Sequence, residues 1–265
     1  MKVITFNLRN FTDDHWDQRR PLMVQDMIRY DADVLAFQEV RGYINNPDNN
    51  MAKQIQEDLQ EQGVDYPSLV VQQAMPYPDQ GVWEGLAIMA KVDIAKSGYK
   101  ELTLGQGSDP NKRIVLWAQF DVENGTFYVF NNHFSYDENQ AMLNAKEVIT
   151  YMNSFDGPGL LVGDLNTTPD SDVVQYIADN GWQDVWETFY PDDDGFTFRP
   201  WALIKRIDYL WMNKYWSAQV FVNAVQSIER IFTRCDHDSG EYPSDHLGLM
   251  TAFTPATALP SSSKD

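Results

Sequence analysis

Polar side chains that can bind metals or transfer protons recur along this sequence where short apolar runs end or begin. The set comprises Asn7 after TF, Glu39 after LAFQ, His133 after VFNN, Asp164 after LLVG, Asp208 inside RIDYLW, and Asp245 with His246 before LGLM. A carboxylate at the end of a buried strand is unfavourable unless it is paired or binds a cation. Because strand ends can converge on one rim of a layered fold, we expect these side chains to form a single site.

The residue types of this set indicate phosphoester chemistry. Oxygen ligands from Asn7, Glu39 and Asp164 suit a hard cation such as Mg²⁺ or Mn²⁺, and histidines with separate carboxylate neighbours fit acid–base chemistry on a metal-bound phosphate. The sequence contains no HExxH, GxxxxGK[ST] or GxSxG segment, and Cys235 is its only cysteine. A zinc protease, a P-loop nucleotide hydrolase, an α/β-hydrolase and a disulfide-linked scaffold are therefore unsupported.

Strands and helices that would position these residues follow from the apolar pattern. Period-2 alternation or short apolar runs predict strands at 2–7, 34–38, 68–74, 85–90, 93–104, 114–121, 126–132, 159–163, 206–211, 217–225 and 247–253. Helical spacing predicts helices at 17–30, 51–62, 138–153 and 171–180. Many strands with fewer helices predict two packed sheets covered by helices. We expect one domain over 1–254 and a disordered tail at 255–265 (PATALPSSSKD).

Composition narrows the possible partners. The 265 residues carry a net charge of −19, which repels polyanions at long range and so disfavours DNA or RNA as the substrate. No apolar run reaches the roughly 18 residues that a membrane-spanning helix needs, so we expect no transmembrane segment, and we expect a monomer. The location would be cytoplasmic if the chain is complete and extracellular if a signal peptide once preceded it.

A series of short motifs carries a family resemblance. FNLRN at 6–10, AFQEV at 36–40, FNNHF at 130–134, VGDLNTTPDS at 162–171, RIDYLW at 206–211 and SDHLGLM at 244–250 resemble, in order and spacing, the motifs of the endonuclease/exonuclease/phosphatase superfamily, in its broad bacterial-type branch. The resemblance covers nearly the whole domain. It implies a DNase I-like fold, a four-layer α/β sandwich of two mixed sheets flanked by helices.

The resemblance also implies a role for each matching residue. Glu39 matches the principal metal ligand, with Asn7 and Asp245 near the ion, and the ion would be Mg²⁺ or Mn²⁺. Asp164 and Asn166 match the pair that positions the attacking water and contacts the phosphate. His246 matches a general base or phosphate ligand, with Asp208 as its orienting carboxylate. His133 matches a catalytic, substrate-contacting histidine of the phosphatase and DNase-like branches.

Three functions remain open on this basis. The leading hypothesis is a metal-dependent phosphodiesterase or phosphomonoesterase that acts on a small molecule or a lipid headgroup. The second is an endonuclease or exonuclease of the same mechanism, which would need a basic groove. The third is a binding module that has lost catalysis, although no expected ligand or base is missing.

Two further groups of residues have more ordinary interpretations. Arg19 and Arg20 could bind a substrate phosphate, but they are expected to be charges on a helix surface. Trp83, Trp182, Trp186 and Trp201 are expected to pack in the core or in loops rather than to form a substrate platform.

Overall fold

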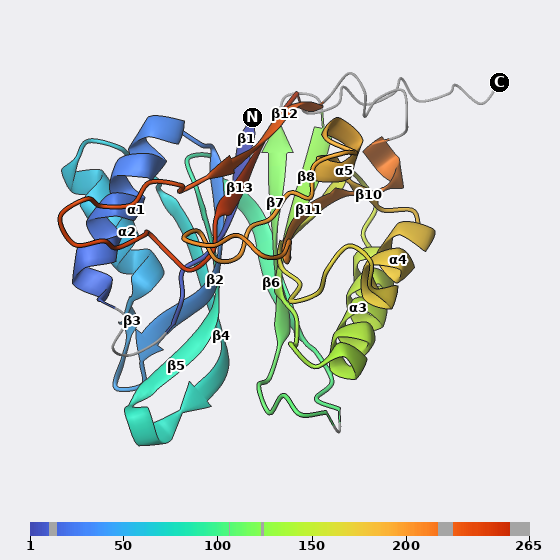
Figure 1. The fold of residues 1–265 in the computed structure, drawn as a ribbon, viewed down its shortest axis with the longest axis horizontal. Helices are drawn as coiled ribbons and strands as arrows, with labels where there is room; N and C mark the ends of the chain where they lie inside the picture. Colours follow the sequence, from blue (N-terminus) through green and yellow to red (C-terminus); the bar gives the residue numbers. More distant parts are fainter. Residues whose placement is uncertain (11–14, 106, 123–124, 217–224, 255–265) are drawn as a thin grey trace.

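The computed structural model of the chain describes residues 1–10, 15–105, 107–122, 125–216 and 225–254 (Figure 1). Two mixed β-sheets lie face to face, and helices cover the outer face of each sheet. The order of the layers is therefore helix, sheet, sheet, helix. This arrangement confirms the four-layer α/β sandwich predicted from the sequence.

The first sheet is built around a parallel pair of strands. Its members are β1 (Lys2–Asn7), β2 (Val34–Tyr43), β3 (Asn46–Asn50), β4 (Ser68–Tyr77), β5 (Val82–Ala90), β12 (Val225–Ile231) and β13 (Gly248–Phe253). They lie in the order β12-β13-β1-β2-β5-β4, with β3 against β2. Strands β1 and β2 are parallel, whereas β13 and β5 run antiparallel to them. Helices α1 (Trp16–Tyr30) and α2 (Met51–Glu61) cover the outer face.

The second sheet repeats this arrangement. Its members are β6 (Ile94–Glu101), β7 (Ile114–Val122), β8 (Gly125–His133), β9 (Gly159–Asp164), β10 (Gln183–Asp184) and β11 (Asp208–Met212), in the order β10-β11-β9-β8-β7-β6. Strands β8 and β9 are parallel, and β7 and β11 run antiparallel to them. Helices α3 (Glu138–Met152) and α4 (Asp172–Asp179) cover the outer face, and α5 (Val185–Phe189) follows β10.

Apolar side chains fill the space between each pair of layers. Val3 of β1 lies in the core between the sheets, and its neighbour Ile4 lies in the core beneath α1 and α2. Leu160 and Leu161 of β9 divide in the same way between the central core and the core beneath α3 and α4. Since successive side chains of a strand point to opposite faces, a central strand of this sandwich buries apolar side chains on both faces. The short continuous apolar runs of the sequence have this origin.

The two parallel pairs direct the chemistry to one edge of the sandwich. Parallel strands end at the same edge of a sheet, and an antiparallel neighbour begins there. Accordingly, β1 ends where β13 begins, and β8 and β9 end where β11 begins, whereas β2 passes this edge at Glu39 and continues to Tyr43. We refer to this edge as the catalytic rim, after the role predicted for its residues, and define it by Asn7, Glu39, His133, Asp164, Asn166, Asp208, Asp245 and His246.

Several elements differ from the sequence-based expectation. The strand predicted at 217–225 lies almost entirely outside the described residues, and the strand observed there is β12, Val225–Ile231. Its buried residues are Val225, Ile228 and Ile231, because a register shift between Val225 and Ser227 places Val225 and Ile228 in the core between the sheets, whereas Ile231 lies on the opposite face, in the core beneath α1 and α2. That shift hides the period of two by which strands are recognised. The short elements β3, β10 and α5 were also not predicted, because two to five residues are too few for a periodic pattern.

Candidate active site

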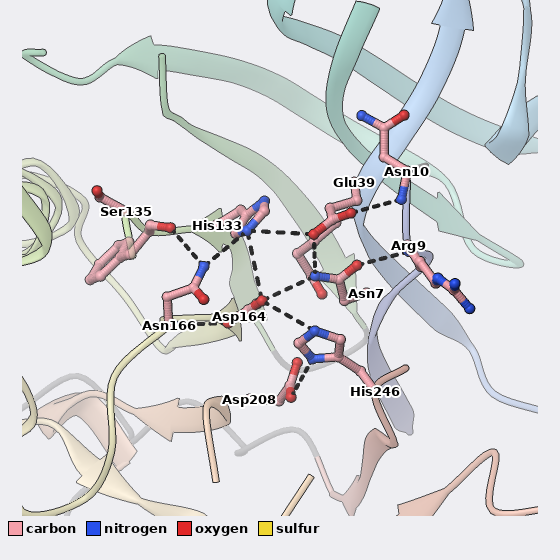
Figure 2. A network of polar contacts seen from close by, with 12 residues as sticks. Asn7, Arg9, Asn10, Glu39, His133, Ser135, Asp164, Asn166, Asp208 and His246 are labelled. Atoms are coloured by element: carbon pink, nitrogen blue, oxygen red, sulfur yellow. Dashed lines mark hydrogen bonds and ion pairs between the residues drawn. The ribbon is translucent and has the colours of Figure 1, made fainter. Parts of the chain in front are cut away.

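The structure brings seven of the sequence-predicted polar residues together at the catalytic rim (Figure 2), and Asp245 directly precedes one of them, His246. His133 and Asp164 are paired across β8 and β9, and Asp164 and Asp208 are paired across β9 and β11. Asn7 ends β1, beside Gln38 in the neighbouring strand β2. The rim therefore combines residues of both sheets, and it lies where the sheets face each other.

Glu39 points into the rim because β2 contains a bulge. The register between β2 and β5 shifts between Phe37 and Val40, so that two residues of β2 oppose one residue of β5. Glu39 has a φ of 53°, a left-handed conformation that a non-glycine residue seldom adopts. A bulge re-aims the side chain at which it occurs. Regular strand geometry would have placed Glu39 on the opposite face from Gln38, so the local irregularity selects the direction of this carboxylate.

Asn7 links the carboxylates of the two sheets. It is fully buried, and its Nδ2 donates to Glu39 Oε1 at 3.1 Å and to Asp164 Oδ2 at 3.0 Å (Figure 2). Its Oδ1 accepts a hydrogen bond from the backbone N–H of Arg9 at 2.9 Å. Because the amide nitrogen faces the carboxylates, Asn7 can offer an oxygen to a cation only after its amide turns over. Its role as a metal ligand stays a prediction.

The charge of Glu39 is incompletely balanced. The backbone N–H of Asn10 donates to Glu39 Oε2 at 2.7 Å. Burial and then the neighbouring Glu84 carboxylate raise the pKa of Glu39, with a smaller contribution from Asp245. Holding Glu39 ionised is thus unfavourable in the protein alone. A cation bound at Glu39 would offset this effect.

A tight turn after β9 orients Asp164 and Asn166. The backbone N–H of Asn166 donates to Asp164 Oδ1 at 2.8 Å, and Asn166 has a φ of 52°. Asn166 Nδ2 donates to the Phe134 carbonyl at 3.1 Å and lies 3.1 Å from His133 Nε2. A Cβ at Gly163 would lie 1.9 Å from the Asn132 carbonyl oxygen, so only glycine allows β8 and β9 to approach at this point. The hydrogen bond from the Asn166 N–H to Asp164 forms an Asx-type turn, and the phosphate contact of Asn166 stays a prediction.

His246 is held between two carboxylates of the second sheet. Its Nδ1 lies 2.9 Å from Asp208 Oδ2, and its Nε2 lies 3.7 Å from Asp164 Oδ2. Burial alone would lower the pKa of His246, but Asp208 and Asp164 together raise it to about 10. Burial raises the pKa of Asp208, although its contact with His246 opposes that effect. The imidazole is therefore protonated at neutral pH, with Nε2 free to donate into the rim.

Sequence reasoning missed a second charged cluster, which consists of Glu84, Asp109 and Arg113. Arg113 Nη2 donates to Asp109 Oδ2 at 3.0 Å, Arg113 Nη1 lies 3.0 Å from His133 Nδ1, and Glu84 Oε1 lies 3.4 Å from the same nitrogen. Burial alone would raise the pKa of Glu84, but His133 and Arg113 lower it to about 2. Glu84 is therefore ionised and orients His133.

The sequence held a signal for this second cluster. Glu84 lies near the start of β5, before GLAIM, and Arg113 stands directly before IVLWA at the start of β7, so each lies where an apolar run begins at the rim. Attention to the starts of strands, as well as to their ends, would have found both residues. A pocket of about 440 Å³ adjoins them, lined by Asn10, Glu39, Tyr77, Gln80, Val82, Glu84, Asn111, Arg113, His133, Tyr136 and Asn166.

Buried polar contacts behind the rim fix its two halves. Arg19 was expected on a helix surface, but it is fully buried, and its Nη1 donates to the carbonyls of Leu8 at 3.0 Å and Pro243 at 2.6 Å. It thereby ties the segment after Asn7 to the segment before Asp245. Between the sheets, Gln38 Nε2 donates to Asn131 Oδ1 at 2.7 Å.

The four tryptophans were expected to pack in the core or in loops. Trp83, Trp182 and Trp186 are buried, whereas Trp201 is 52% exposed.

Comparisons with known proteins place the chain among relatives of the same architecture. The Endonuclease/Exonuclease/phosphatase family matches residues 4–246. An endonuclease/exonuclease/phosphatase family protein from Leptotrichia buccalis is 21% identical, with a TM-score of 0.75 over 96% of this chain and 99% of that one. A mannosyl-6-phosphatase from Bacteroides thetaiotaomicron is 20% identical, with a TM-score of 0.70 over 96% and 99%.

The catalytic domain of human Nocturnin, solved with a bound sulfate anion, is 19% identical, with a TM-score of 0.70 over 97% of this chain and 93% of that one. At such identities these structures show the shared fold. No curated protein matches the chain in sequence.

Proposed function

The chain belongs to the endonuclease/exonuclease/phosphatase family, and from this premise we propose that it is a Mg²⁺- or Mn²⁺-dependent hydrolase of phosphodiesters or phosphomonoesters carried by small molecules or lipid headgroups. Family membership supports phosphoester hydrolysis as the type of reaction. The finer proposal rests on one observation above all. Glu39, His133 and Asp164 each offer a ligand atom at the rim, and these atoms lie within 4.8 Å of one another.

The donor set of the rim fits a divalent cation. Glu39 and Asp164 supply carboxylate oxygens, which hard cations prefer, and Asn7 and Asp245 are the further residues that we assign to the site. The raised pKa of Glu39 has burial and Glu84 as its main causes, so a positive charge is favoured at this place. A bound Mg²⁺ or Mn²⁺ would polarise a phosphoryl oxygen and stabilise the charge that develops during attack.

The residues around the proposed cation would orient the water, transfer protons and contact the phosphate. Asp164 would orient the attacking water and receive its proton, because its Oδ2 lies between the two histidines, 3.7 Å from Nε2 of each. Asp208 holds Nδ1 of His246. With a pKa raised to about 10 by Asp208 and Asp164, His246 acts as a charged donor to a phosphoryl oxygen rather than as the base. Asn166 and His133 present their nitrogens beside the same position.

The substrate class follows from charge, and it is directly testable. Affinity for duplex DNA depends on several phosphate contacts, each of which adds about −0.9 to the log–log salt slope, whereas a small phosphoester brings only one or two charges. With a net charge of −19, we expect efficient metal-dependent hydrolysis of bis-p-nitrophenyl phosphate or p-nitrophenyl phosphate. The mannosyl-6-phosphatase among the similar structures supports including a monoester. Plasmid DNA should be cleaved slowly and only at low salt.

The measurement is kcat/KM for both small substrates and for plasmid DNA and RNA, with Mg²⁺, with Mn²⁺ and with a chelator, at low and near-physiological ionic strength. Activity that persists in chelator would refute the metal requirement. Plasmid cleavage that exceeds small-diester hydrolysis and survives the higher salt would show that the protein is a nuclease and that the charge argument is wrong.

Glu84 provides a second prediction, because it contacts His133 and is not among the residues assigned to the cation. Glu84→Gln keeps the size of the side chain but removes the charge that faces His133 Nδ1 at 3.4 Å. Loss of such an orienting partner typically lowers activity roughly 10- to 100-fold. We expect a fall of this size in kcat for the small diester. The matched control is Glu61→Gln at the end of α2, and equal rates for the two variants would contradict the assignment.

A further inference from the structure

A loop between α5 and β11 presents apolar side chains to solvent beside the catalytic rim. Phe198 and Lys205 form an antiparallel bridge that closes the loop, and the Ile204 N–H donates to the Phe198 carbonyl at 2.9 Å. Within the loop, the Ala202 N–H donates to the Arg199 carbonyl at 2.9 Å. The backbone hydrogen bonds are thus made at the base and inside the turn. Residues 200–204 (PWALI) form the part that we call the apolar tip.

The apolar tip is unusually exposed for its composition. Trp201 is 52% exposed, Leu203 38% and Ile204 56%. Tyr190, 41% exposed, extends this surface, since it lines with Pro200 and Leu203 the same hollow of about 540 Å³. Single exposed apolar residues are ordinary, but a consecutive run of them marks a surface that is covered in use.

The position of the tip connects it with catalysis. Phe198, at the base of the loop, forms a second antiparallel bridge with His246, and their rings lie 5.0 Å apart. Trp201 packs at 6.1 Å against Tyr242, which shortly precedes the segment SDH of the rim. The base of the loop is therefore held next to the proposed phosphate position at His246.

Charges of both signs surround the tip. Arg199 and Lys205 flank it, and the guanidinium and ammonium groups lie 5.3 Å and 4.9 Å from the centre of the Phe198 ring. Asp192, Asp193 and Asp194 line a common surface with Ile204 and Lys205. A zwitterionic phospholipid headgroup carries a phosphate and a quaternary ammonium group, which match these two sets of charges. An anionic surface would instead be repelled by the net charge of −19.

We propose that residues 198–205 form a lipid-contact loop, whose apolar tip inserts into the surface of a zwitterionic phospholipid bilayer and holds the catalytic rim at the headgroups. Tryptophan and aliphatic side chains flanked by basic residues favour the bilayer interface. A stable protein partner normally covers about 800 Å² from 20–30 residues on each side, which is far more than this short run offers. The inference rests on the proposed function, because it selects lipid headgroups among the phosphoesters considered there.

Vesicle binding of the full chain tests the proposal. Wild-type protein should co-sediment with phosphatidylcholine vesicles, and less so when phosphatidylserine is added. The double variant Trp201→Ser/Ile204→Ser should bind at least about tenfold more weakly, because two apolar side chains no longer leave water. The control variant Tyr99→Ser/Tyr215→Ser also removes two exposed rings, which are 46% and 42% exposed. Tyr99 lies on β6, and Tyr215 follows the end of β11 that is opposite the rim. This variant should bind vesicles as the wild type does.

Hydrolysis of water-soluble bis-p-nitrophenyl phosphate by the same variants separates this inference from the proposed function. Equal rates for wild type and the tip variant, with different vesicle binding, would support the lipid-contact loop. Failure of the wild type to bind phosphatidylcholine, or equal binding by both double variants, would overturn it even if the soluble diester is hydrolysed. A concentration-dependent dimer that the tip variant loses, without vesicle binding, would assign the tip to a second copy instead. If the wild type does not hydrolyse the diester but the variants differ on vesicles, the proposed function fails and the loop assignment stands.

Discussion

Replacing Glu39 by glutamine is expected to lower metal-dependent hydrolysis at least about 100-fold, beyond the range that loss of an outer orienting partner produces. Glu39 is the carboxylate that Asn7 and the Asn10 backbone direct into the rim, and burial followed by Glu84 raises its pKa. Mn²⁺ affinity, measured by calorimetric titration, should fall together with the rate.

Stability distinguishes the loss of a ligand from the loss of the fold. Because the pKa of Glu39 is raised, its ionised form is disfavoured in the folded protein above the ordinary glutamate pKa, and this penalty is absent from the neutral glutamine. Glu39→Gln should therefore unfold at the same temperature as the metal-free wild type or a higher one, and the added stability that Mn²⁺ gives the wild type should disappear. Glu57→Gln on α2 is the control. Unchanged Mn²⁺ affinity in Glu39→Gln would refute the assignment.

The second large effect concerns the pair formed by His246 and Asp208. Their contact of 2.9 Å makes Asp208 the group that keeps His246 charged and oriented. Each of His246→Ala and Asp208→Ala is expected to lower kcat on the order of 100-fold or more. The double variant should be little worse than the slower single variant, because residues that act as a unit have non-additive effects.

Asp208→Asn refines this test, because it retains the shape of the buried side chain while removing its charge. It should lose most of the rate that Asp208→Ala loses. His237→Ala, a change to an exposed histidine outside the rim, provides the control. Rates that multiply independently in the double variant would show that His246 and Asp208 do not work as a pair.

Both effects have the same structural origin, because the rim is shared between the two sheets. Glu39 and His246 come from the first sheet and its flanks, whereas Asp164 and Asp208 come from the second. Contacts between the sheets at the rim include the bond of Asn7 to Asp164 and the pairing of His246 with Asp208. A slip of one sheet against the other would therefore separate the proposed metal ligands and the His–Asp pair together. The buried contact of Gln38 with Asn131 opposes such a slip.

The polar residues at the ends of apolar runs could be predicted from the sequence, because a buried strand has a recognisable run of apolar residues. A strand inside a four-layer sandwich is apolar on both faces, so LAFQ, LLVG and similar runs stand out, and a polar residue after such a run needs a reason. The motif order then led to the DNase I-like fold. The elements that escaped prediction were those with no local period, such as β12 with its register shift and the five-residue helix α5.

The contacts between individual side chains and the directions in which these side chains point, in contrast, were decided by the tertiary structure. The sequence does not indicate that a bulge turns Glu39 inward, that Arg19 is buried against Leu8 and Pro243, or that Trp201 is exposed while Trp83, Trp182 and Trp186 are not. Nor does it join Glu84 and Arg113 to His133, since these residues lie on different strands.

The physical reason for this division is the range of the interactions involved. Burial of one or both faces of an element produces a regular spacing of apolar residues along the chain. The sequence by itself therefore determined most of the strands, the layers and the candidate set from Asn7 to His246. Directions of side chains and the pKa values of Glu39, Glu84 and His246 depend on charges and hydrogen bonds between residues distant in the chain. Only the packing of the two sheets brings those groups within reach of one another.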